Sequence, residues 1–273
     1  MLGAIIGDIV GSVYEWHNIK TKDFPLFRDD CFFTDDTVMT IATADAIMNG
    51  GKADDFIYAY KKWGRLYPDS GYGGRFGAWI HSDDCKPYNS WGNGSAMRVS
   101  PCAEYAYKSY YPGDCPETSI YNARQLAIVS SGVTHDHPEG IKGAEVTAYC
   151  IMMAYGYGLE AAKKHIREEI PLLFDYYLNR TLDEIRPTYR FNESCQDTVP
   201  QAIVAFLEST DFEDAIRNAI SLGGDSDTLA AITGSIAEAA YGVPDWIKDK
   251  ALSYLDAPLK DVYNRWTSYI RKA

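Results

Sequence analysis

The chain has 273 residues, of which 46% are hydrophobic and 14% aromatic, enough for a sizeable buried core. Its formal net charge is −12, from 26 basic and 38 acidic residues, so its average field repels phosphate polymers and anionic membrane surfaces. These numbers exclude general nucleic-acid binding and membrane-surface binding as main functions. They leave open a small phosphate-bearing ligand held by a metal or by backbone N–H groups.

The sequence carries no sign of a targeting segment or of a disulfide framework. The first eight residues (MLGAIIGD) lack a basic segment, and no apolar run approaches the roughly 20 residues of a membrane-spanning helix. The cysteines are scattered without C-x-x-C spacing, which is typical of unpaired thiols in a reducing compartment. We therefore expect a cytoplasmic protein. The six cysteines are Cys31, Cys85, Cys102, Cys115, Cys150 and Cys195.

The first predicted helix covers residues 2–16, where apolar side chains recur at helical spacing. Gly3, Gly7 and Gly11 each cost such a helix about 1 kcal/mol relative to alanine, so they indicate close packing or the approach of a ligand. Asp8 and Glu15 are seven positions apart, which places both carboxylates on one face, two turns from each other.

A second helix is predicted from Thr34, a good N-cap, to Met48, before a turn at residues 49–51. Asp35 and Asp36 fall in its first turn. Acidic residues are common there because the helix dipole favours them. Simple capping and metal binding therefore both remain open for this pair.

Residues 68–101, after a predicted helix over 54–66, form a long stretch rich in Gly, Tyr, Trp and Ser with weak helical periodicity. A loop of this length in a compact domain is usually functional or disordered, and its aromatic content argues against disorder. Gly92-Asn93-Gly94-Ser95 can present backbone N–H groups to a phosphate, although an ordinary turn explains the same pattern.

The remaining sequence predicts helices joined by short connections. Two histidines, His135 and His137, lie on a predicted loop with no third soft ligand nearby, so we expect substrate hydrogen bonding or helix capping there and no zinc site. No series of alternating β-branched segments, linker or repeat is present, and we predict one all-α domain over residues 1–273. Helices are expected at 95–107, 117–133, 138–157, 159–170, 171–178, 197–207, 211–222, 229–242, 244–255 and 257–271, with a polar connector at 183–196.

A second acidic helix start lies at residues 223–228 (GGDSDT), where Asp225, Ser226 or Asp227 can cap a helix of small residues. If this start meets Thr34–Asp36, four carboxylates and two hydroxyls share one place. Such carboxylates repel one another and need compensation, which hard divalent cations such as Mg²⁺, Mn²⁺ or Ca²⁺ supply. Four carboxylates offset two divalent charges, so a pair of ions is plausible. Sequence spacing alone does not establish that the two helix starts meet.

Five segments in the same order resemble the motifs of the ADP-ribosylhydrolases of the dinitrogenase-reductase-activating glycohydrolase type. They are residues 7–15 (GDIVGSVYE), 33–37 (FTDDT), 90–98 (SWGNGSAMR), 134–135 (TH) and 223–228 (GGDSDT). The resemblance covers nearly the whole chain. Its first and third motifs look most like the branch that cleaves serine-linked and poly-ADP-ribose.

This resemblance implies an all-α orthogonal multi-helix bundle with two Mg²⁺ or Mn²⁺ ions. It implies that Glu15, a mobile glutamate, and Asp36 handle proton transfer. Trp91 stands where that branch often has tyrosine, and Ser95 stands in place of a glycine. The implied metal ligands are Thr34, Asp35, Asp36, Asp225, Asp227 and Thr228. The implied substrate-binding residues are Ser90, Trp91, Gly92, Asn93, Gly94, Ser95, Met97 and His135.

The expected function is metal-dependent hydrolysis of the glycosidic bond that links ADP-ribose to a modified side chain or another acceptor. The expected partner is an ADP-ribosylated protein or another ADP-ribosylated substrate, and the chain is expected to be a monomer. Arginine, serine, O-acetyl and nucleobase linkages stay open. Three alternatives also remain: an ADP-ribose-binding protein without turnover, a metal hydrolase acting on another nucleotide-linked substrate, and acidic residues that serve only as helix caps.

Overall fold

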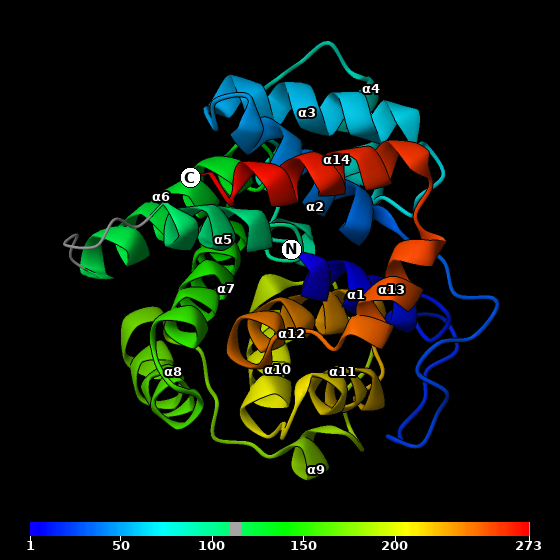
Figure 1. Cartoon of the computed structure of the whole chain (residues 1–273), viewed down its shortest axis with the longest axis vertical. Helices are drawn as coiled ribbons and strands as arrows, with labels where there is room; N and C mark the ends of the chain where they lie inside the picture. The colour runs from blue at the N-terminus through cyan, green and yellow to red at the C-terminus, as the bar shows by residue number, and fades with distance from the viewer. Residues whose placement is uncertain (110–115, 273) are drawn as a thin grey trace.

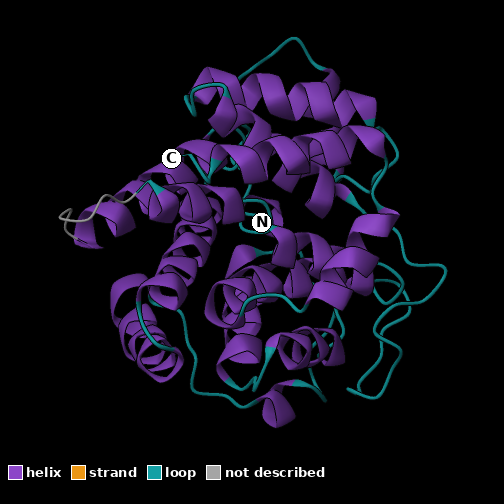
Figure 2. Ribbon diagram, viewed as in Figure 1, coloured by secondary structure: helices purple, strands orange, loops and turns teal. Residues whose placement is uncertain are grey.

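The computed structural model describes residues 1–109 and 116–272, and within them the regular structure is helical, with no strand (Figures 1 and 2). One isolated antiparallel bridge joins Gly92 to Ser194. The all-α prediction is confirmed. The helices are α1 Leu2–Gly11, α2 Asp35–Met48, α3 Ala53–Leu66, α4 Gly74–His81, η1 Asn93–Ser95, α5 Ser100–Lys108, α6 Pro116–Gly132, α7 Pro138–Gly156, α8 Leu159–Phe174, α9 Leu182–Ile185, α10 Cys195–Leu207, α11 Phe212–Ser221, α12 Ser226–Tyr241, α13 Asp245–Tyr254 and α14 Ala257–Tyr269.

The helices form two groups that meet at α1. In Figure 1, α2, α3 and α14 lie together at one end, and α10, α11 and α12 lie at the other. Helix α7 runs steeply across the direction of α3 and α14 and packs against α5, α6, α8, α10 and α12. One continuous hydrophobic cluster joins buried side chains from both groups. The arrangement brings the N-terminal ends of α2 and α12 toward α1.

Helices α1 and α12 pack more extensively against each other than any other pair. Their backbones are nearly in contact: a Cβ on Gly7 would lie 2.0 Å from the Ala230 carbonyl oxygen, and one on Gly3 would lie 2.0 Å from that of Gly234. A Cβ on Gly11 would lie 2.4 Å from the Asp227 Cα. The close packing expected from the three glycines is therefore present. It fixes α1 directly beside the first turn of α12.

Helix α1 ends at Gly11 and not near residue 16 as predicted. The Ser12 hydroxyl donates to the Ile9 carbonyl at 2.9 Å, and the Tyr14 N–H bonds to the Gly11 carbonyl in a turn. Local side-chain bonding of this kind competes with helix continuation. Glu15 therefore lies beyond the helix and does not share a helix face with Asp8.

Other helix boundaries also differ from the sequence prediction. The 68–101 stretch contains α4, whose Phe76, Trp79 and Ile80 are buried, and its C-terminal helix α5 starts at residue 100. Residues 159–174 form one helix through Pro171, because proline fits helical φ and the carbonyl that it leaves unpaired belongs to the exposed Arg167. The polar connector contains α9, which a Thr181–Glu184 capping box stabilises. Helix α10 begins two residues early, after Ser194.

The cysteines and the apolar character of the helices can be read directly from the described residues. Cys115 lies outside the described residues, and the other five cysteines are free thiols, of which Cys85 alone is exposed. No helix in the described ranges combines the length and apolar character needed to cross a membrane.

We predict that Gly7→Ala lowers the free energy of unfolding by about 1–3 kcal/mol, because the added methyl collides with the α12 backbone and outweighs the gain in helix propensity. Gly156→Ala is the matched control, since a Cβ at this helical position meets no atom within 4 Å. Urea unfolding of both variants measures the difference. Equal stability of the two variants would contradict the close α1–α12 contact.

Candidate metal centre

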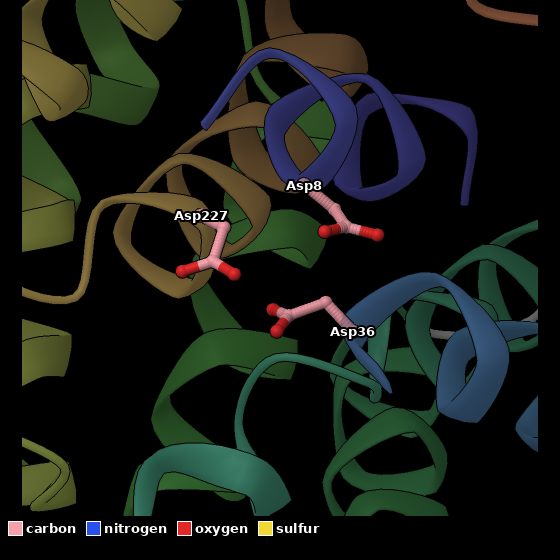
Figure 3. Close-up of side chains that lie close together, drawn as sticks. All are labelled: Asp8, Asp36 and Asp227. Atoms are coloured by element: carbon pink, nitrogen blue, oxygen red, sulfur yellow. The ribbon is translucent and has the colours of Figure 1, made fainter. Parts of the chain in front are cut away.

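Three carboxylates from three helices converge at the meeting point of α1, α2 and α12 (Figure 3). Asp8, Asp36 and Asp227 are all buried, and one oxygen of each lies within 4.8 Å of the others. In an overlapping group of Glu15, Asp225 and Asp227, one carboxylate oxygen of each residue likewise lies within 4.8 Å of the others. The Thr228 hydroxyl also donates to Asp36 Oδ2 at 3.1 Å. The two acidic helix starts singled out in the sequence therefore meet in the fold.

Asp8 is the member of this cluster that the sequence motifs did not assign. Its carboxylate accepts from the Thr34 hydroxyl at 2.6 Å, the Thr34 N–H at 2.9 Å and the Thr37 N–H at 3.0 Å. Asp8 thus caps the start of α2 from a different helix. The signal available in the sequence, an aspartate on a glycine-rich helix, gives no indication of this partner.

Asn93 connects the acidic cluster to the loop at residues 90–95. Its side-chain amide donates to Asp225 Oδ2 at 2.6 Å and to the Thr198 hydroxyl at 3.1 Å. The Asp227 carboxylate accepts the Thr228 N–H at 3.0 Å. The predicted substrate-binding residue Asn93 therefore also orients a carboxylate of the cluster.

Burial raises the pKa of every carboxylate in the cluster, and repulsion between carboxylates adds to it at Glu15, Asp35, Asp36 and Asp227. Burial raises the pKa of Asp8 to about 6, and burial followed by the charges of Asp225, Asp8 and Glu193 raises the pKa of Glu15 to about 7. Burial is likewise the first cause, and neighbouring carboxylates the next, of the strongly raised pKa values of Asp35, Asp36 and Asp227. The cluster therefore lacks positive charge.

The donor set fits a hard divalent cation. The cluster offers only carboxylate and hydroxyl oxygens, which are the ligands that Mg²⁺, Mn²⁺ and Ca²⁺ take. Asp36 Oδ1 is buried and has no hydrogen-bond partner among the described residues. A cation there would satisfy this oxygen and offset the repulsion that raises the pKa values.

Five carboxylates, those of Glu15, Asp35, Asp36, Asp225 and Asp227, line a cavity of about 470 Å³. The 90–94 loop, His135 and two arginines, Arg75 and Arg98, line the same cavity. The cavity therefore combines carboxylates with groups that can donate hydrogen bonds. The predicted site residues that line it are Glu15, Asp35, Asp36, Ser90, Trp91, Gly92, Asn93, Gly94, Met97, His135, Asp225, Asp227 and Thr228.

Two predicted site residues do not line this cavity. Thr34 is buried, and its hydroxyl donates to Asp8 at 2.6 Å. Ser95 is fully buried, and its hydroxyl donates to the Gly140 carbonyl at 2.7 Å, so it anchors the loop to α7. Neither position is open to a substrate.

An aromatic pair that the sequence did not single out stands at the cavity wall beside Glu15. The rings of Trp16 and Phe191 stack with centroids 5.0 Å apart, and 72% of Trp16 is exposed. Trp16 follows Glu15 directly, whereas Phe191 comes from the segment before α10. Phe191 lies in the polar connector, where nothing in the sequence indicates that it contacts the site.

Residues 1–268 of the chain match the family model that is described as ADP-ribosylglycohydrolase. The chain belongs to the ADP-ribosylglycohydrolase family. The family resemblance and the enzyme class expected from the motifs, ADP-ribosylhydrolase, are thereby confirmed.

Several named relatives of this ADP-ribosylglycohydrolase resemble it to a similar degree. The ADP-ribosylarginine hydrolase Tri1 of Pseudomonas putida is 27% identical over 93% of this chain and 73% of its own. ADP-ribosylhydrolase ARH3 of Mus musculus is 25% identical over 89% and 83%, and ADP-ribosyl-[dinitrogen reductase] glycohydrolase of Rhodospirillum rubrum is 26% identical over 93% and 88%. These identities do not separate one branch of the family from another.

A solved structure supports the fold. A chain of an ADP-ribosylglycohydrolase-related protein complex superposes with a TM-score of 0.65, covering 93% of this chain and 95% of its own at 24% sequence identity.

We predict that, without metal, Asp227→Asn is more stable than the wild type at pH 7.5 by about 1–3 kcal/mol. The folded-state pKa of Asp227 is raised. Folding therefore favours the protonated carboxyl of Asp227. The stability that this preference contributes is fully present below the unfolded-state pKa near 3.8 and is lost as the pH rises through the folded-state pKa. The difference between the two proteins should thus vanish near pH 4. Urea unfolding in EDTA across this pH range measures it.

Addition of Mg²⁺ supplies the second half of this test. Because a ligand of the folded state stabilises it by mass action, Mg²⁺ should raise the unfolding midpoint of the wild type and do so much less for Asp227→Asn. Asp54→Asn, an exposed aspartate in the first turn of α3, is the control and should respond as the wild type does. A less stable Asp227→Asn together with no Mg²⁺ response in any variant would identify the cluster as a structural network.

Proposed function

We propose that this family member hydrolyses the glycosidic bond between ADP-ribose and an acceptor, with two divalent ions, Mg²⁺ or Mn²⁺, bound in the acidic cluster. The observation that carries the proposal is the lining of the cavity, which combines carboxylates with the glycine-containing 90–94 loop, His135 and two arginines. An ADP-ribosyl group has matching chemistry. Its distal ribose offers hydroxyls to cations, and the diphosphate attached to that ribose needs hydrogen-bond donors.

Six residues would hold the ions: Thr34, Asp35, Asp36, Asp225, Asp227 and Thr228. Bound divalent ions orient ribose hydroxyls or a water and stabilise negative charge. The carboxylates around the cavity stabilise the positive charge that develops on the ribose carbon during cleavage. Glu15 or Asp36 moves the proton between the water and the leaving group, since both carboxylates line the cavity.

The chain between residues 90 and 97 would bind the diphosphate. Gly92 and Gly94 carry no side chain that would separate the backbone from a diphosphate. A Cβ at either position would lie 3.4–3.5 Å from His135 Nε2, so both glycines also leave space for that ring. Trp91, 47% exposed, offers a ring face to the remainder of the ligand.

The names of the relatives support an ADP-ribosylated protein as the substrate. They mention ADP-ribosylarginine and ADP-ribosyl-dinitrogen reductase. For this chain the linkage stays a proposal to be tested on a panel of arginine-, serine- and DNA-linked ADP-ribose. We also propose a single cytoplasmic domain, supported by one continuous hydrophobic cluster and by buried free thiols. The monomeric state stays a prediction.

We predict that Glu15→Gln lowers kcat for ADP-ribose release by about 10²–10⁴-fold, the usual loss for a missing acid–base group, and leaves the Kd for free ADP-ribose within a few-fold of wild type. Chromatographic detection of released ADP-ribose with saturating Mg²⁺ measures kcat, and calorimetry measures Kd. Asp54→Asn is again the control. Full activity of both Glu15→Gln and Asp36→Asn would sink the assignment.

The same assay distinguishes the alternatives. A wild-type protein that binds ADP-ribose but releases none from any substrate of the panel would be a binding protein. A protein that neither binds ADP-ribose nor is inhibited by it would act on another nucleotide-linked substrate.

A further inference from the structure

Arg98 is a buried guanidinium without a carboxylate partner among the described residues. Its side chain is 1% exposed and lies 4.2 Å above the centroid of the Tyr60 ring. Arg98 Nη2 donates to the Ser130 carbonyl at 3.2 Å and to the Thr134 hydroxyl at 2.8 Å, whereas Nε finds no hydrogen-bond partner in the part of the chain that the structure describes. A buried cation that no anion compensates is costly, so its position beside the cavity calls for a reason.

The hydrogen bonds of Arg98 fix the direction of the next bond. A guanidinium can only donate, so the Thr134 oxygen must accept from it. The hydroxyl hydrogen of Thr134 then has two candidate acceptors, His135 Nδ1 at 2.8 Å and the Ser131 carbonyl at 3.5 Å. The shorter distance assigns this hydrogen to His135 Nδ1, because hydroxyl hydrogen bonds are best near 2.7–2.8 Å.

The same geometry determines the tautomer of His135. Burial, and then the charges of Arg98 and Arg75, lower the pKa of His135 well below its usual range, so the ring is neutral. A neutral imidazole whose Nδ1 accepts carries its proton on Nε2. His135 Nε2 lies beside Gly92 and Gly94 at the cavity wall, and no group in the described ranges accepts a hydrogen bond from it.

We propose that Arg98 and Thr134 are positioning residues that hold His135 as a neutral Nε2–H donor aimed at a phosphate oxygen of the ligand. The phosphate occupant rests on the proposed function. Its support here is that the carboxylates of the cluster repel an anion from their part of the cavity, whereas the uncompensated charge of Arg98 attracts one toward His135. The relay fixes the donor before the ligand arrives, so binding needs no change of tautomer.

Two variants of Thr134 test the relay. Thr134→Ser keeps the hydroxyl and should behave as the wild type, whereas Thr134→Val keeps the shape and removes the bond to Nδ1. Nitrogen-15 NMR of histidine-labelled protein reports the tautomer, and a His135→Gln spectrum assigns the signal among the five histidines. We expect the Nε2–H form in the wild type and in Thr134→Ser, and a mixture or the Nδ1–H form in Thr134→Val.

The affinity for ADP-ribose, measured by calorimetry, gives the functional readout. We expect the Kd to rise about tenfold in Thr134→Val, the effect of one lost hydrogen bond to a charged group, and to stay within about twofold in Thr134→Ser. An Nδ1–H tautomer in the wild type would overturn the proposal, as would a Thr134→Val protein with unchanged tautomer and Kd. If Thr134→Val fails to fold, the wild-type and Thr134→Ser tautomers still decide.

These readouts separate the relay from the proposed function. Failure of the wild type to bind ADP-ribose would contradict the proposed function, whereas the tautomer is measured without ligand and would still decide the positioning roles.

Discussion

Backbone contact between α1 and α12 brings two buried carboxylates of the site, Asp8 and Asp227, together. With glycines at positions 3, 7 and 234, no side chain separates the two helices, and α1 lies directly against the first turn of α12. This distance places Asp8 beside Asp227, and Asp8 in turn holds the start of α2 through Thr34. The glycines weaken α1 as an isolated helix. Tertiary packing compensates for that weakness, and the result is a junction of three helices at one acidic point.

The acidic point is electrostatically unfavourable as it stands, which is the physical reason to expect cations there. Partial compensation comes from the protein itself: Asp36 and Asp227 lie in the first turns of α2 and α12, where the helix dipole favours negative charge, and Asn93 donates to Asp225. These contributions leave the carboxyl pKa values raised. Holding these carboxylates together lowers the free energy of unfolding, and such an arrangement is typical of functional sites.

Sequence reasoning predicted the helical fold and most helices because their periodicity and caps are local signals. It also found both acidic helix starts, since Thr34 and Asp225 carry N-cap patterns. Contacts between residues distant in sequence could not be predicted. Nothing in the local sequence around Asp8 shows that its carboxylate caps α2, and nothing around Phe191 shows that its ring stacks on Trp16. The end of α1 at Gly11 was missed because a serine side chain competes with the helix at that place. The family resemblance named Arg98 and Thr134 within motifs, but only the three-dimensional geometry shows how they act on His135.

Binding of divalent cations at this junction is tested directly with Mn²⁺, because the ion is located by its anomalous scattering. Crystals of the wild-type protein grown with Mn²⁺ should show two anomalous peaks about 3.5–4 Å apart, the usual spacing of a two-metal site, among Asp35, Asp36, Asp225 and Asp227. Peaks elsewhere, or none at saturating Mn²⁺, would contradict the account.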